Sequence, residues 1–271
     1  MPARTEITTQ QLSRLIGAPD APPLVDICIE DDFALDPRLI PGAFRWPYHR
    51  IGELAPRFQG RKVVVICQKG KKLSQGAAAM LRAEGVEAQF ASGGVVAWRD
   101  AGLPLIPADA IPPRDAAGRT VWVTRQRPKI DRIACPWLIR RFVDPGARFL
   151  FVAPSEVEAV AEKFDAAPFD VAGVRWTHRD GGCTFDTMLD EFALDPAPLK
   201  TLAKIVRGAD TNQPELAAQS AGLLAASLGL SRMYGDDLAQ LDAGMVIYDA
   251  LYRWARDAQG ETHDWTPEAE A

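Results

Sequence analysis

A short apolar run at residues 63–66 ends at Cys67, and a helical pattern follows at residues 73–84. A run of this length, rich in valine, is typical of a strand that is buried on both faces of a parallel sheet. The loop between the run and the helical pattern is short, as in the strand–loop–helix units of α/β proteins. This part of the chain is therefore expected to fold around a parallel sheet with helices on both faces.

Cys67 carries the most distinctive chemistry of this unit. It stands where a buried strand leads into a helix N-terminus, at which backbone N–H groups and the helix dipole favour an anion. Positive charge close to a thiol favours the thiolate, which is the nucleophilic form. The pattern predicts Cys67 as a catalytic nucleophile, and the alternative is a buried structural thiol in an inactive module. The loop that Cys67 opens is cationic and consists of Gln68, Lys69, Gly70, Lys71 and Lys72.

Strand-like and helix-like segments alternate around this unit. The alternation predicts a parallel sheet with flanking helices in a first domain at residues 1–106. Ligands bind such sheets beyond the carboxyl ends of the strands, where Cys67 stands. Strands are predicted at residues 23–29, 62–66 and 87–91, and helical segments at residues 8–16, 48–54, 73–84 and 95–101.

A proline-rich stretch divides the chain. Residues 107–118 lack usable periodicity and are predicted to link the first domain to a second one at residues 119–258. The second domain is expected to begin as α/β and to become mainly helical, and a loose tail follows at residues 259–271. Its strands are predicted at residues 120–124, 148–152 and 174–178. Its helices are predicted at residues 132–143, 155–164 (with Ser155 as the cap), 184–192, 197–207, 214–229 and 236–257.

Charge and hydropathy exclude several classes of partner. The net charge of −5 over 271 residues argues against a general nucleic-acid binder. No apolar run approaches the roughly 20 residues that span a bilayer, and the N-terminal residues lack the apolar core of a signal peptide. The sequence therefore predicts a cytoplasmic protein with neither nucleic acid nor membrane as a partner.

The four cysteines, Cys28, Cys67, Cys135 and Cys183, are widely spaced and form no Cys-x-x-Cys pair. In a reducing compartment this spacing is typical of free thiols. Cys28 ends a predicted strand of the same sheet as Cys67, so it would be either a resolving thiol or a small hydrophobic residue. Cys135 lies among apolar residues, which favours a packed core cysteine over a redox thiol.

Several motifs of the first domain occur in an order that resembles the rhodanese family. They are Leu-Val-Asp-Ile at residues 24–27, Ile-Pro-Gly-Ala at 40–43, the loop that begins at Cys67, and Ser-Gly-Gly-Val-Val-Ala-Trp at 92–98. The resemblance implies that Cys67 takes sulfane sulfur from a donor and passes it to an acceptor thiol, without a cofactor. Lys72 stands where the family often has arginine, which leaves the preferred donor open because lysine cannot make the bidentate contact. A cysteine phosphatase would need a longer loop that ends in arginine.

Two dense stretches of the second domain, at residues 122–142 and 177–186, resemble the C-terminal domain of the chromate-resistance regulator family. Further matches lie at residues 205–210 and 248–252, so the resemblance covers about residues 119–254. It implies a role in tolerance of, or response to, chromate. The N-terminal part of the full regulator differs from this chain, so a transcriptional role is not implied.

Together the two resemblances predict a sulfurtransferase that is linked to resistance against chromate or another oxyanion. The alternative is a non-enzymatic sensor of chromate or oxidative stress, which would bind a thiol-reactive oxyanion or a metal. A thiol-dependent chromate reductase is a third interpretation, but the chain lacks a flavin or nicotinamide fingerprint that would supply electrons.

A basic turn in the second domain is a candidate anion pocket. Guanidinium groups beside a helix N-terminus suit a tetrahedral oxyanion such as chromate. The alternative is that these side chains make salt bridges with nearby aspartates, namely Asp131, Asp144, Asp180 and Asp210. The candidate residues are Arg125, Arg127, Lys129 and Arg132.

A second stretch offers candidate metal ligands. His178, Cys183, Asp186 and Glu191 are of the types that bind zinc or iron, although their spacing matches no standard zinc finger. The alternative is a polar network between His178, the acidic residues and the arginine cluster.

Overall fold

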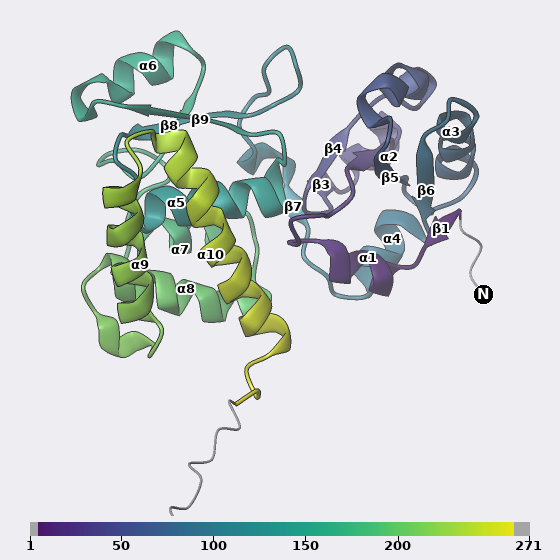
Figure 1. Cartoon of the computed structure of the whole chain (residues 1–271). Helices are drawn as coiled ribbons and strands as arrows, with labels where there is room; N and C mark the ends of the chain where they lie inside the picture. The colour runs from purple at the N-terminus through teal and green to yellow at the C-terminus, as the bar shows by residue number, and fades with distance from the viewer. Residues whose placement is uncertain (1–4, 263–271) are drawn as a thin grey trace, which may run out of the picture.

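The computed structural model describes residues 5–262, which form two domains side by side (Figure 1). Strands β1–β7 lie in one domain, while β8–β10 and the long helix α10 lie in the other. The predicted tail falls largely outside the described residues. None of the described helices combines the length and the apolar character that a membrane crossing needs. The division at residues 106 and 119 stays a prediction.

A five-stranded parallel sheet forms the centre of the first domain, in the order β1-β6-β5-β2-β4. The central strand β5 (Lys62–Ile66) pairs with β6 (Glu87–Ala91) on one side and with β2 (Leu24–Asp26) on the other. The outer strands are β1 (Glu6–Ile7) and β4 (Ala43–Arg45). The predicted α/β fold with a parallel sheet and flanking helices is confirmed.

The side chains of β5 alternate between two apolar layers, which explains why its sequence is apolar without interruption. Val63 and Val65 pack in the layer that contains η1 and α3, whereas Val64 and Ile66 pack in the layer of α1 and α4. The covering helices are α1 (Thr9–Leu15), the 3₁₀ segment η1 (Tyr48–Phe58), α3 (Lys72–Ala83) and α4 (Gly94–Asp100). Shorter elements are α2 (Glu30–Ala34), η2 (Ala108–Ala110) and the antiparallel pair β3 (Arg38–Leu39) and β7 (Ile106–Pro107).

The second domain begins with a small parallel sheet and continues with helices, as predicted. Its strands have the order β10-β8-β9, with β8 at Val121–Arg125, β9 at Arg148–Val152 and β10 at Ala167–Pro168. Helix α5 (Asp131–Leu138) continues into the π-helical turn η3 (Ile139–Val143). The remaining elements are η4 (Pro154–Glu156), α6 (Val157–Lys163), α7 (Thr184–Glu191), α8 (Ala197–Asp210), η5 (Pro214–Leu216), α9 (Ser220–Met233) and α10 (Asp237–Asp257).

Two local predictions for this domain are wrong. Residues 174–178 form no strand, because Trp176 makes only one bridge, to Phe169, after the chain has turned back beside β10. Ser155 does not cap a helix, because its hydroxyl binds the Glu156 carboxylate at 3.0 Å and lies inside η4. The helix therefore begins later, at Val157.

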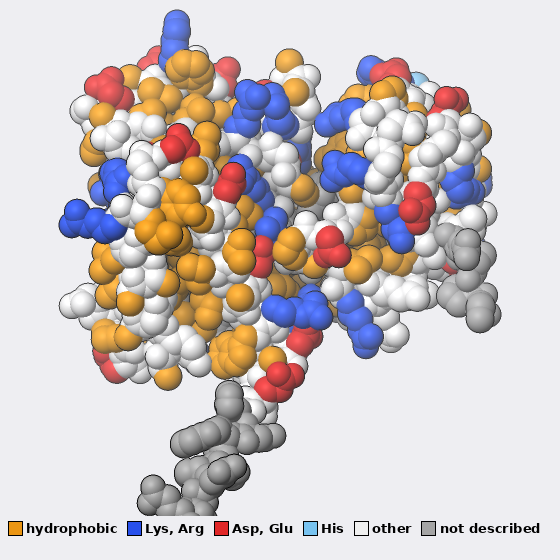
Figure 2. Space-filling model, viewed as in Figure 1, with side chains coloured by type: hydrophobic (Ala, Val, Ile, Leu, Met, Phe, Trp, Pro, Cys, Tyr) orange, Lys and Arg blue, Asp and Glu red, His pale blue; other side chains and the backbone are white. Residues whose placement is uncertain are grey.

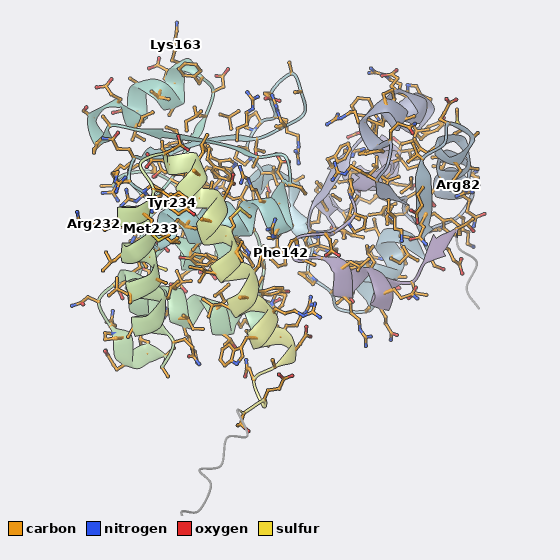
Figure 3. All side chains as sticks on the ribbon, viewed as in Figure 1. Arg82, Phe142, Lys163, Arg232, Met233 and Tyr234 are labelled. Carbon is orange, nitrogen blue, oxygen red and sulfur yellow. The ribbon has the colours of Figure 1, made fainter. Side chains whose placement is uncertain are left out.

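The two domains share an apolar junction at Phe142, which Figure 3 labels. The backbone N–H of Gly42 in the first domain donates to the carbonyl oxygen of Phe142 at 2.5 Å. Gly17 has a φ of +83°, and a Cβ atom there would lie 2.5 Å from the Phe142 ring. The two domains thus pack closely at Phe142, and a larger residue at position 17 would not fit.

Basic side chains flank this junction on both sides (Figure 2), and a cavity there is lined by Arg57, Arg61, Arg114 and Arg119, among others.

Asp249 fastens the long helix α10 to α5 and η3. Its carboxylate accepts two hydrogen bonds from Arg141, both at 2.8 Å, and one from the indole N–H of Trp137, also at 2.8 Å. The side chains of Arg141 and Asp249 are only 16% and 15% exposed. The pair is therefore mostly withdrawn from water, and loss of one partner leaves a poorly solvated charge.

We expect Asp249→Ala to lower the free energy of unfolding of the second domain by about 3 kcal/mol, because Arg141 loses its buried partner. Asp242→Ala is the matched control on the same helix, since Asp242 pairs with Arg140 but is 71% exposed. The control is expected to cost less than about 1 kcal/mol. Urea unfolding of the full chain measures both, and equal losses would contradict the assignment.

Candidate functional site

Cys67 directly follows β5 and keeps the alternation of that strand. Its side chain packs in the layer of Val63 and Val65, on the side of α3, and is only 5% exposed. The loop that follows leads into α3 at Lys72. The thiol therefore lies at the base of the loop, between the end of the central strand and the first turn of the helix.

Ser74, in the first turn of α3, is the hydrogen-bond partner of the thiol. The Cys67 thiol donates to the Ser74 hydroxyl over 3.2 Å, and that hydroxyl donates to the Lys71 carbonyl oxygen at 3.3 Å. The Ser74 side chain is fully buried. Because a hydroxyl can rotate, Ser74 can accept from the thiol and donate to the thiolate.

The loop after Cys67 packs closely against the chain at the start of α4, and a glycine on each side makes this possible. Gly70 and Gly94 have φ values of +62° and +61°. A Cβ atom on Gly94 would lie 2.0 Å from the carbonyl oxygen of Cys67, so only glycine fits there. The backbone N–H groups of Val95 and Val96 bind the carbonyl oxygens of Cys67 and Gln68 at 3.2 and 3.0 Å. The Gly-Gly motif and the residues that follow it thus fix the loop through close backbone contacts and hydrogen bonds.

The three loop lysines supply positive charge that is not neutralised locally. Lys69, Lys71 and Lys72 are exposed, and none of them forms an ion pair with another described residue. They surround the N-terminus of α3, which itself favours negative charge. The arrangement can therefore attract an anionic reagent to Cys67.

Cys28 follows β2, the neighbour of β5, but packs in the opposite apolar layer from Cys67. Burial raises the pKa of Cys28 well above its ordinary value, and the nearby Asp26 carboxylate adds to the rise. Both observations favour the small hydrophobic residue over the resolving thiol. Cys135 is also fully buried with a pKa raised by burial, as expected for a core cysteine.

A cluster of ionisable side chains lies in the second domain around His178. The Nε2 atom of His178 lies 3.5 Å from a carboxylate oxygen of Asp131 and 3.5 Å from one of Asp170. A carboxylate oxygen of Asp210 is 3.2 Å away. Within the part of the chain that the structure describes, Asp131, Asp170 and His178 form a group with the spacing of metal ligands.

Burial dominates the electrostatics of this cluster. It raises the pKa of Asp131 well above the ordinary value, and the negative charges of Asp210 and Asp170 add to the rise. Burial and the charge of Asp170 likewise raise the pKa of Asp210, which His178 partly offsets. Both carboxyl groups are therefore protonated more readily than ordinary aspartates.

The structure separates the four basic residues of the predicted anion pocket. Arg125 and Arg132 contact one oxygen of Asp170 at 3.0 and 3.2 Å. Arg127 instead donates to the carbonyl oxygens of Ser231 and Tyr234 at the end of α9. Figure 3 labels Tyr234. Lys129 is exposed and lines a separate cavity with Arg127. Two of the arginines thus make salt bridges, as the alternative interpretation predicts, but their partner is Asp170 and none of the four predicted aspartates.

Comparison with known proteins accounts for both parts of the chain. Residues 8–101 match the model of the rhodanese-like domain, and residues 122–255 match the model of the ChrB C-terminal domain. The chain joins a rhodanese-like domain to a ChrB C-terminal domain. Both resemblances that the sequence motifs indicate are confirmed.

One curated relative matches across part of its length. Protein ChrB from Cupriavidus metallidurans is 36% identical over 155 residues, which cover 56% of this chain. The match covers 46% of that protein, so this chain spans less than half of the relative.

Solved structures are similar to about a third of the chain. A rhodanese-related protein from Thermoplasma volcanium is 21% identical, with a TM-score of 0.33, over 38% of this chain and 97% of that one. A thiosulfate sulfurtransferase from Pseudomonas aeruginosa is 26% identical, with a TM-score of 0.33, over 38% of this chain and 19% of that one.

The structure does not bring the four predicted metal ligands together. Of His178, Cys183, Asp186 and Glu191, only His178 belongs to the group with ligand spacing among the described residues. Glu191 binds Arg175 and Arg179, whose hydrogen bonds hold its pKa below the ordinary value.

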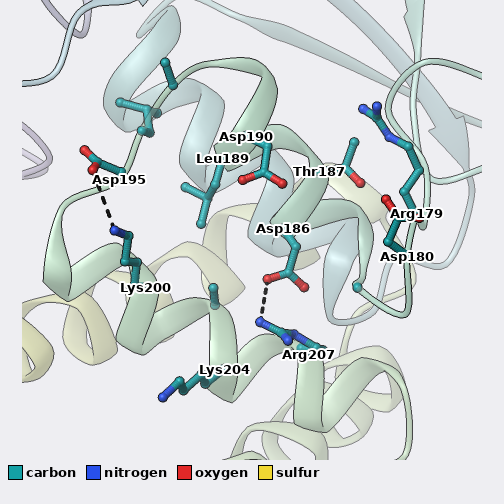
Figure 4. A pocket seen from close by; sticks show the side chains of 14 residues that line it. Arg179, Asp180, Asp186, Thr187, Leu189, Asp190, Asp195, Lys200, Lys204 and Arg207 are labelled. Atoms are coloured by element: carbon teal, nitrogen blue, oxygen red, sulfur yellow. Dashed lines mark hydrogen bonds and ion pairs between the residues drawn. The ribbon is translucent and has the colours of Figure 1, made fainter.

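Asp186 faces a neighbouring cavity and pairs with Arg207 at 3.0 Å (Figure 4). It also accepts a hydrogen bond from the backbone N–H of Cys183 at the start of α7. Burial raises the pKa of the Cys183 thiol, so this residue is a poor thiolate ligand. The described residues with ligand spacing beside His178 are instead Asp131 and Asp170, which come from other segments.

Several residues of the two sites were not singled out from the sequence. Ser74 was hidden in a helical pattern, although its place in the first turn after the loop is a usable signal. Asp170 and Asp210 join His178 only through the fold, because they come from the end of β10 and the end of α8. Asp131 and Asp210 were named from the sequence only as salt-bridge partners.

Proposed function

We propose that the chain is a sulfurtransferase that carries sulfane sulfur on Cys67. The observation that carries this proposal is the thiol at the N-terminus of α3, hydrogen-bonded to Ser74 and surrounded by unpaired lysines. The match of residues 8–101 to the rhodanese-like domain supports it. The expected activity is of the thiosulfate sulfurtransferase type and needs no cofactor.

The chemistry proceeds in two steps. The Cys67 thiolate attacks the outer sulfur of a donor such as thiosulfate, a sulfur–sulfur bond forms, and sulfite leaves with the electron pair of the broken bond. An acceptor thiolate, or cyanide, then attacks the outer sulfur of the persulfide and restores the Cys67 thiolate. Lysines of the loop and the α3 N-terminus stabilise the negative charge of donor and persulfide.

We further propose that the second domain connects this activity to resistance against chromate or another oxyanion. The support is the match of residues 122–255 to the ChrB C-terminal domain and the identity to Protein ChrB. The partners of the chain would then be a sulfur donor, a thiol acceptor and the oxyanion. All four cysteines are free, which supports a reducing compartment such as the cytoplasm.

Thiosulfate-dependent conversion of cyanide to thiocyanate by the full chain tests the proposal. We expect turnover that is proportional to protein concentration and that saturates with thiosulfate. A folded, reduced protein that produces no thiocyanate above the uncatalysed rate would contradict sulfur transfer. That result would favour the non-enzymatic sensor.

We expect Ser74→Ala to lower kcat/KM for thiosulfate about tenfold, the effect of losing one hydrogen bond to a charged sulfur. Ser13→Ala is the control, because among the described residues its hydroxyl hydrogen-bonds to the Gln10 carbonyl oxygen on α1, far from Cys67 in the sequence. Steady-state kinetics of both variants measure the effect. An unchanged kcat/KM in a folded Ser74→Ala protein would remove Ser74 from the site.

A further inference from the structure

The second domain contains a cluster that sulfur transfer does not use, at the carboxyl edge of its sheet. Asp131 is the first residue of α5, and Asp170 follows β10 after one residue. Asp210 ends α8, and His178 precedes α7. We propose that these four side chains bind a divalent transition-metal ion. The site is independent of Cys67 and differs from the ligand set that sequence spacing indicates.

The distances around His178 fit such an ion. Four ligands placed tetrahedrally at metal bonds of about 2.1 Å lie about 3.4 Å apart. The Nε2 atom of His178 is 3.5 Å from both Asp131 and Asp170 and 3.2 Å from Asp210. The ligand atoms of Asp131, Asp170 and His178 all lie within 4.8 Å of one another. One ion can therefore reach these three side chains. Asp210 contacts His178 but lies outside this group, so its side chain would have to move toward the ion to complete the set.

Charge gives an independent reason for a cation. Among the described residues, Asp131 and Asp210 form no ion pair with a lysine or arginine, and His178 is their only basic contact. The Asp131 side chain is 1% exposed. Buried carboxylates are normally paired or bound to metal, and one dication would neutralise both of these.

The hydrogen bonds of the cluster leave oxygens available for an ion. The Oδ2 atom of Asp131, which lies 3.5 Å from His178, accepts from the backbone N–H of Thr184 at 2.5 Å and keeps a second lone pair. The buried Oδ1 atom has no hydrogen-bond partner. Arg125 and Arg132 contact Oδ2 of Asp170, whereas Oδ1 faces His178 and accepts from the Thr184 hydroxyl. Donors of this kind orient carboxylate ligands in metal sites.

The donor set selects the class of ion. One imidazole nitrogen with three carboxylate oxygens suits Mn²⁺, Fe²⁺ or Zn²⁺ better than a thiolate-loving ion. The His178 side chain is 44% exposed, so one side of the ion would face solvent. A water molecule would therefore be able to join the four side chains as a fifth ligand.

Metal analysis of the full chain tests the site directly. Protein stripped with a chelator is incubated separately with Mn²⁺, Zn²⁺ or, without oxygen, Fe²⁺, then dialysed and analysed by mass spectrometry of the elements. We expect one ion per chain with at least one of these metals, and a Tm that rises with its concentration. The Co²⁺-substituted protein should lack a thiolate-to-metal charge-transfer band, since no cysteine belongs to the set.

Variants separate this site from general surface binding. His178→Ala and Asp210→Asn are each expected to weaken metal affinity at least about tenfold and to reduce the metal-dependent rise in Tm. His49→Ala, at an exposed histidine of the other domain, and Glu191→Gln are the matched controls and should bind as the wild type does. Wild-type protein that retains none of the three metals would overturn the proposal. Unchanged binding by the folded His178→Ala variant would do the same.

Discussion

Cys67→Ser is expected to reduce thiosulfate:cyanide turnover by more than about a thousandfold, because a serine hydroxyl cannot carry sulfane sulfur. The fold should persist, since serine is of similar size and can keep the hydrogen bond to Ser74 that the thiol makes. Steady-state kinetics and thermal unfolding of the same preparation measure both properties.

Cys28→Ser is the matched control for this substitution. Cys28 ends the neighbouring strand but packs in the opposite apolar layer, so turnover should stay within about twofold of the wild type. Activity that survives in Cys67→Ser, or that disappears in a folded Cys28→Ser protein, would contradict the assignment of the nucleophile.

Gly94→Ala is expected to lower the free energy of unfolding of the rhodanese-like domain by about 3 kcal/mol and to remove most of its turnover. The added Cβ would lie 2.0 Å from the carbonyl oxygen of Cys67 and 2.6 Å from the backbone nitrogen of Gly70. Both contacts are with backbone, so the whole loop must move. Urea unfolding and the thiocyanate assay measure the two effects.

Gly76→Ala provides the control for a glycine in the same part of the domain. Gly76 is exposed on α3. Apart from its chain neighbours and the backbone of its own helix, no atom lies within 4 Å of an added Cβ. Alanine is the better helix former, so this variant should gain up to about 1 kcal/mol and keep its turnover. If both glycine variants behave alike, close packing of Gly94 against the loop is not what requires glycine there.

The fold of the first domain could be predicted because local and long-range signals agree. The run at residues 63–66 is apolar on both faces, and the structure places its side chains alternately in two layers. Thr8 caps α1 in a capping box with Gln11, which is the kind of local hydrogen bonding that sequence reveals.

The second domain was harder to predict where elements are short or irregular. Strand β10 has two residues, one of them a proline, so it carries no periodicity. Residues 174–178 look like a strand, yet they make a single bridge because the chain only returns beside β10. Whether a segment of this kind pairs as a strand depends on its tertiary contacts more than on the strand propensity of its residues.

The two candidate sites differ in the same way. Cys67, its loop and the Gly-Gly motif are short-range features, so sequence alone locates them. The cluster around His178 joins side chains from four separate segments, whereas residue type along the sequence suggested Asp186 and Glu191 as its acidic members. Both of those carboxylates pair with arginines in the structure. Local spacing cannot reveal which acidic residues lack a basic partner.

Mass spectrometry of the intact, reduced chain after incubation with thiosulfate tests the central claim most directly. We predict a mass gain of one sulfur atom that maps to the peptide containing Cys67, is lost on addition of cyanide and is absent from Cys67→Ser. A folded wild-type chain that gains no sulfur, or that carries it on Cys28, would contradict sulfur transfer through Cys67.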